Sequence, residues 1–89
     1  MTDLHLHVKT IYFRQIESGE KVTEYRLASD HWINLLIDRK YNNVVIHNAF
    51  KPGDHNRLTF NYRGFVREII THPHFGPDPV KVYAIPLIK

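Results

Sequence analysis

The chain has 89 residues, of which 43% are hydrophobic and 24% charged, enough for one domain with a single modest core. It contains no cysteine, which excludes disulfide bonds, a thiol nucleophile and a cysteine-ligated zinc site. No run of about 18 apolar residues and no signal-peptide pattern are present, and the net charge of +3 mildly favours anionic partners. We therefore expect a single cytoplasmic domain over residues 1–89, without a membrane segment.

The N-terminal half predicts a strand, a short helix, a second strand and a second helix. Residues 4–8 alternate apolar and polar side chains, the period of a half-buried strand whose histidines face solvent or a cleft. Residues 11–18 carry one apolar stripe of a short helix, and Gly19 suits the left-handed position that ends a helix. A strand follows from Val22. Ser29 is a helix cap, and the apolar stripe behind it predicts a helix of about ten residues.

The C-terminal half predicts four further strands. They are expected at residues 44–50, 58–62, 65–71 and 80–85. Polar or Pro- and Gly-containing stretches predict the connections, at residues 38–43, 52–54, 63–64 and 72–79. The short turn at 63–64 predicts a hairpin of the strands on either side of it. Five to six short strands with two short helices and no βαβ rhythm predict an α+β fold built on a small mixed β-barrel.

A charged stretch at the junction of the first helix and second strand is the strongest functional signal. On a strand, Glu24 and Arg26 share one face because successive side chains alternate. Lys21 precedes the strand and can lean over the same face. The arginine fork suits a carboxylate, a phosphate or a base edge. The alternative is a solvated ion pair beside a turn, worth little energy.

These residues also carry a family resemblance. The run Gly19-Glu20-Lys21-Val22-Thr23-Glu24-Tyr25-Arg26 resembles the G-x-K-x-x-E-x-R signature of the ASCH domain family, small β-barrel proteins similar to PUA domains. An aromatic and an aliphatic residue on the preceding helix, Tyr12 and Ile16, are also in place. Lys51-Pro52-Gly53-Asp54 is similar to the K-x-G-D turn of the family, and residues 72–85 resemble a phage- and prophage-rich branch.

The resemblance implies an RNA-binding or RNA-modifying module whose cleft is lined by Lys21, Glu24 and Arg26. The expected ligand is RNA or a modified nucleoside or nucleotide, and Glu24 accepts a hydrogen bond from a base amino group. Tyr25 and Phe75 are expected as stacking partners, because unpaired bases are commonly recognised on aromatic side chains. Further candidates for phosphate or stacking contacts are Trp32, Arg57, Tyr62, Arg63 and Arg67.

The alternative function is a hydrolase acting on an acylated nucleoside or on RNA, with Lys21 catalytic and Glu24 relaying a proton. One ASCH branch removes the acetyl group of N4-acetylcytidine with a lysine, a threonine and a glutamate. Lys21 matches that lysine, Glu24 stands at the threonine position, and the helical insertion that carries the glutamate is missing. A third interpretation is a phage-derived interaction module with a vestigial cleft.

Seven histidines raise the question of a metal site. The pairs His5 with His7 and His72 with His74 have a spacing that brings two rings to one side of an extended segment. Surface imidazoles and loop-fixing hydrogen bonds are the preferred interpretation, with His72 to Phe75 shaping the rim of the cleft. We expect no metal, no cofactor and a monomeric chain.

Overall fold

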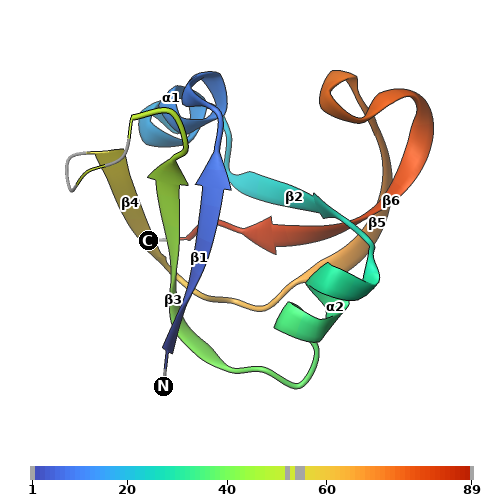
Figure 1. The fold of residues 1–89 in the computed structure, drawn as a ribbon, viewed down its shortest axis with the longest axis horizontal. Helices are drawn as coiled ribbons and strands as arrows, with labels where there is room; N and C mark the ends of the chain where they lie inside the picture. Colours follow the sequence, from blue (N-terminus) through green and yellow to red (C-terminus); the bar gives the residue numbers. More distant parts are fainter. Residues whose placement is uncertain (1, 52, 54–55, 89) are drawn as a thin grey trace.

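The computed structural model describes residues 2–51, 53 and 56–88 (Figure 1). Two helices and six strands are found in this part of the chain, which confirms the small α+β prediction. In chain order they are β1 (Thr2–Val8), α1 (Thr10–Ser18), β2 (Thr23–Leu27), α2 (Asp30–Leu36), β3 (Tyr41–Asn48), β4 (Arg57–Asn61), β5 (Val66–His72) and β6 (Gly76–Pro86). A 3₁₀ turn, Pro73–Phe75, joins the last two strands.

The strands form two three-stranded sheets. In the first, β3 pairs in parallel with β1 and antiparallel with β4; in the second, β6 is the centre of an antiparallel sheet with β2 and β5. Among the described residues no closed barrel is found, so the predicted barrel is not confirmed. A bridge between Asn61 and Ile88 connects the first sheet to the chain beyond β6. The strands β1 and β2 are edge strands of different sheets, and no described ladder joins them (Figure 1).

The core lies between the sheets and is capped by α1 and α2. Alternation along β1 turns Leu4, Leu6 and Val8 inward, as predicted, because one face of the strand is buried. The helical stripe of α1 adds Phe13 and Ile16. The other buried members of this cluster are Leu36, Val44, Ile46, Phe60, Tyr83, Ile85 and Leu87. Both helices therefore cover the core with the faces predicted by their apolar period.

The predicted helix ends are confirmed where capping residues define them. Gly19 has φ 86°, and its N–H donates to the carbonyl of Ile16, which ends α1 in the left-handed conformation. The Ser29 hydroxyl accepts from the Trp32 N–H at 3.4 Å and starts α2. α2 has 7 residues, shorter than the expected ten. No helix of the described residues is long and apolar enough to cross a membrane.

The predicted hairpin across residues 63–64 is wrong. Gly64 does turn the chain, with φ 81°, but β4 pairs with β3 and β5 pairs with β6. The link carries the chain from one sheet to the other because its aromatic residues pack into the core. Tyr62 contacts the Tyr41 ring and Phe65 contacts the Tyr83 ring, both edge to face. Burial of the two rings therefore outweighs the local turn signal.

The true hairpin lies in the segment predicted as a loop, residues 72–79. β6 already begins at Gly76, and His72 pairs with Gly76 across the 3₁₀ turn. Prolines 77 and 79 are tolerated because β2 pairs only with Val82 to Pro86, which leaves one edge of β6 free beside them. The long β5–β6 hairpin extends beyond the sheet and brings His72 to Phe75 toward α1 (Figure 1).

The loop predicted at residues 38–43 is too long. β3 starts at Tyr41 because Tyr41 pairs with Thr2 of β1, and Asn43 is opposite Asn61 of β4. Tyr41 is held by its ring contact with Tyr62. Of the predicted turn at residues 52–54, positions 52 and 54 lie outside the described residues.

A candidate ligand cleft

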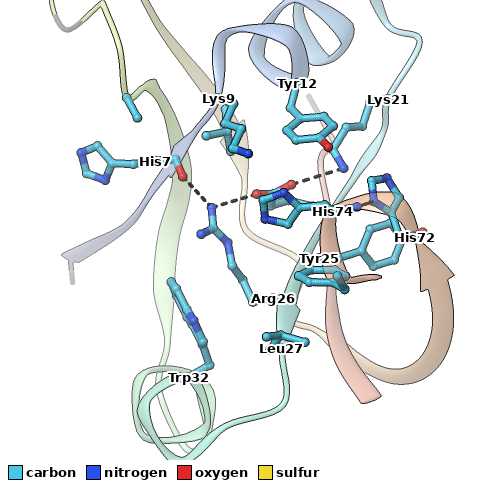
Figure 2. A pocket seen from close by; sticks show the side chains of 14 residues that line it. His7, Lys9, Tyr12, Lys21, Tyr25, Arg26, Leu27, Trp32, His72 and His74 are labelled. Atoms are coloured by element: carbon cyan, nitrogen blue, oxygen red, sulfur yellow. Dashed lines mark hydrogen bonds and ion pairs between the residues drawn. The ribbon is translucent and has the colours of Figure 1, made fainter. Parts of the chain in front are cut away.

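A cavity of about 310 Å³ lies where β1 and β2 diverge. Its walls come from the end of β1 with the start of α1, from the strand β2 with the preceding Lys21, from Trp32 of α2, from Ala49 after β3, and from the tip of the β5–β6 hairpin (Figure 2). All five residues predicted for the ligand site line it: Lys21, Glu24, Tyr25, Arg26 and Phe75. Its volume is at the lower end of the range of small-molecule sites.

Glu24 is the charged centre of the cavity and is 7% exposed. Its Oε1 lies 3.3 Å from the Lys21 ammonium, and its Oε2 accepts from Arg26 Nη2 at 2.8 Å. Each carboxylate oxygen therefore has its own cation, which compensates the cost of burying the charge. The predicted convergence of these three groups on one concavity is what the structure shows (Figure 2).

The local chain path explains this convergence. After α1 ends at Gly19, the Lys21 N–H donates to the carbonyl of Gln15, which folds the link back along the helix. Lys21 therefore stands before the start of β2 and is free of the strand alternation. Glu24 and Arg26 are two residues apart on β2 and share a face. Because β2 is an edge strand, Tyr25 also reaches the cavity beside it (Figure 2).

Arg26 connects β2 of the second sheet with β1 of the first, two strands that no described ladder joins. Its Nη2 donates to the His7 carbonyl of β1 at 3.0 Å while its guanidinium lies 5.0 Å from the centre of the Trp32 ring. The buried Nε of Arg26 has no hydrogen-bond partner among the described residues. The guanidinium therefore joins β1, β2 and α2 around the cavity, while its buried Nε–H stays unpaired among the described residues.

Aromatic rings form the walls around the cations. The Lys21 ammonium lies 5.5 Å from the Tyr12 ring and 5.1 Å from the Tyr25 ring, distances at which a cation is attracted to the ring face. Phe75 also lines the cavity, and its ring contacts the His74 ring with a centroid distance of 5.0 Å. The cavity thus combines charge with several flat apolar surfaces.

Comparisons with known proteins identify no relative. No protein-family model matches the chain, and no curated protein or solved structure matches it. The side chains of the cleft and their contacts are therefore the basis for assigning it a function.

Lys9 was not predicted as a residue of the cleft, and several predicted candidates lie elsewhere. Lys9, the residue between β1 and α1, lines the cavity, and so does His74, which was expected only as part of a rim. The strand pattern of residues 4–8 could have predicted the position of Lys9. A strand that ends beside the cleft places the residue that follows it next to the cleft. The predicted contacts that do not line this cavity are Arg57, Tyr62, Arg63 and Arg67.

Three imidazoles gather on β1 and β3, outside the core. His5 Nδ1 and His47 Nε2 are 2.9 Å apart, and the His7 and His47 rings stack with centroids at 4.7 Å. Parallel pairing opposes His7 with His47 and so brings the rings together. In the described part of the chain, no group of three or more His, Asp or Glu residues has a metal-binding arrangement. Burial lowers the pKa of His47, and the charges of His7, His5 and Arg57 lower it further.

The lowered histidine pKa values predict a loss of stability in acid. The pKa of His74 is also lowered, chiefly by burial and then by Lys9 and His72, with a smaller effect of Arg26 against the opposing effect of Glu24. In the unfolded chain both groups return to about 6.5, so the unfolded state binds more protons below that pH. We expect a lower urea midpoint at about pH 5 than at about pH 8.

Matched variants locate the origin of this acid sensitivity. His47→Gln is expected to reduce the pH dependence of the urea midpoint, whereas His31→Gln, at an exposed position of α2, should leave it unchanged. Equal pH dependence in the wild type and His47→Gln would contradict the assignment.

Proposed function

We propose that the chain binds a nucleoside-like group of RNA, or a nucleotide, in the cleft formed by Lys21, Glu24 and Arg26. The observation that carries this proposal is the combination of one buried carboxylate, two cations and flanking aromatic rings on a cavity sized for one small molecule. A base offers amino donors, ring acceptors and a π face, and the cleft has complementary groups for all three.

The composition of the cleft favours one base over a continuous phosphate track. Glu24 repels a phosphodiester but accepts from an exocyclic amino group, while Lys21 and Arg26 donate to ring nitrogens or carbonyl oxygens. Tyr25 and Phe75 provide surfaces against which a base can stack. The limited volume excludes several stacked nucleotides at once.

Membership of the ASCH family, with its PUA-like barrel, is part of the same proposal. The residues of the resembling signature occupy positions that suit it: Gly19 ends α1 with a positive φ, and Lys21, Glu24 and Arg26 line the cavity. The two sheets, bridged at Asn61 and Ile88, are compatible with an incompletely closed barrel.

The single tryptophan provides the test, because Trp32 lines the cleft and contacts Arg26. Titration with ribonucleosides, nucleotides and short RNA should change its fluorescence in a saturable manner. Lys21→Ala is expected to weaken binding about tenfold or more, since a charge-assisted hydrogen bond is worth at least about 1.4 kcal/mol. Lys40→Ala, at an exposed site away from the cleft, is the control. Absence of saturable binding to every one of these ligands would refute the proposal.

The second candidate is a hydrolase acting on an acylated nucleoside or on RNA. It is favoured by the contact of Lys21 with Glu24, which places a nucleophile or base 3.3 Å from a carboxylate that can relay a proton. Incubation with N4-acetylcytidine and with RNA distinguishes the candidates. Turnover that Lys21→Ala abolishes supports an enzyme, whereas binding without turnover supports a binding module.

A further inference from the structure

The mouth of the cleft carries two basic side chains outside the Glu24 ion-pair network. Lys9 stands at the end of β1, and His74 lies on the tip of the β5–β6 hairpin; both are exposed and both line the cavity. They are close enough for the charge of Lys9 to act on His74. Figure 2 shows their side chains near each other in the lining of the cavity. Lys9 forms no ion pair with any described residue.

The charge of the cleft is not balanced. Lys9, Lys21 and Arg26 face a single carboxylate, Glu24, so the lining carries +2 with its histidines neutral. Lys21, Arg26 and Glu24 together account for one of these two positive charges, and Lys9, which is outside their ion pairs, adds the second. Such an unpaired positive rim attracts an anion and retains it more strongly than open surface does, because the surrounding walls exclude part of the solvent.

We propose that Lys9 and His74 form a subsite for a phosphomonoester, so that the occupant of the cleft is a nucleotide with a terminal phosphate and not a bare nucleoside. This inference rests on the proposed function. The base would lie inside against the aromatic walls and Glu24, and the phosphate would lie at the mouth between the ammonium and the imidazole.

Charge and geometry favour a phosphomonoester over an internal phosphodiester. A monoester carries between −1.5 and −2 charges near neutral pH, which matches the excess of the lining, whereas a diester carries one. Lys9 comes from the junction of β1 and α1 and His74 from the tip of the β5–β6 hairpin, so they can contact different oxygens of one terminal group. The compact phosphate accepts from both without a bidentate fork.

The experiment compares matched ligands by Trp32 fluorescence at a fixed ionic strength of about 0.1 M. Each ribonucleoside is titrated beside its 5′- and 3′-monophosphate, and the ratio of the two dissociation constants is the readout. We expect at least one monophosphate to bind about tenfold tighter than its nucleoside or more. In Lys9→Ala and in His74→Gln this ratio should fall several-fold, and in Lys40→Ala it should be retained.

The outcomes separate the two proposals. A nucleoside that binds as tightly as both of its monophosphates, or a ratio unchanged by Lys9→Ala, overturns the phosphate subsite and leaves the cleft as a nucleoside site. Lack of binding by nucleosides, nucleotides and RNA alike overturns the proposed function as well. Oligonucleotides with and without a terminal phosphate identify the source: tighter binding of the phosphorylated oligonucleotide than of the mononucleotide assigns an RNA end, and the reverse assigns a free nucleotide.

Discussion

Glu24→Ala is expected to destabilise the folded chain by about 3 kcal/mol. The substitution removes the single carboxylate that compensates Lys21 and Arg26, and it leaves two mostly buried cations facing each other. Removal of one partner from a buried ion pair costs about 3–5 kcal/mol. We expect a value at the lower end of this range because the Lys21 and Arg26 side chains remain 16% and 19% exposed. Urea unfolding followed by circular dichroism measures the change.

An exposed ion pair of the same chain is the matched control. Glu17 pairs with Arg14 at 3.0 Å, but the two side chains are about half exposed, 46% and 50%. Glu17→Ala should therefore cost less than about 1 kcal/mol. Glu24→Gln, which keeps the shape and one acceptor, should lie between the two alanine variants. If Glu24→Ala proved no more destabilising than Glu17→Ala, the paired carboxylate would not be a structural centre of the cleft.

Arg26→Ala is expected to cost about 2–3 kcal/mol and to loosen the junction of the two sheets. It removes the donor to the His7 carbonyl, one cation of Glu24, and the contact with Trp32. Hydrogen exchange should show faster exchange of amides in β1 and β2, while β4 keeps its protection.

Arg26→Lys separates charge from geometry. An ammonium keeps the positive charge but cannot present the planar fork that contacts Glu24 and His7 together. We expect it to recover part of the stability and little of the ligand affinity measured through Trp32. Arg39→Ala, at an exposed position after α2, is the neutral control. Full recovery by lysine would contradict the role of the fork.

The short-range part of the site was predictable from the sequence. Gly19 predicts the end of α1, and the alternation of a strand predicts that Glu24 and Arg26 share a face. The relative positions of two of the three charged groups therefore follow from patterns a few residues long. The position of Lys21 over the same carboxylate depended on one turn. These features depend on residues that are close in the chain, and a sequence pattern reports on such short-range relations.

The long-range part was not predictable in the same way. The approach of Lys9 and His74 depends on how β1 meets the β5–β6 hairpin, and no spacing between positions so far apart in the chain encodes it. The hairpin error has the same origin: Gly64 does make a turn, but the burial of Tyr62 and Phe65 decides which strands pair. Strand pairing is governed by packing more than by intrinsic preference.

The pairing order has a consequence for how the chain folds. β2, which carries Glu24 and Arg26, pairs only with β6 in the part of the chain that the structure describes, and Thr23 is opposite Pro86, far along the sequence. Closing so long a loop is entropically costly, and topologies rich in such distant contacts reach the native state slowly. A nascent chain can form the β1–β3 and β3–β4 pairs early, but β2 acquires its partner only when β6 has been synthesised. Assembly of the cleft is thus one of the last events of folding.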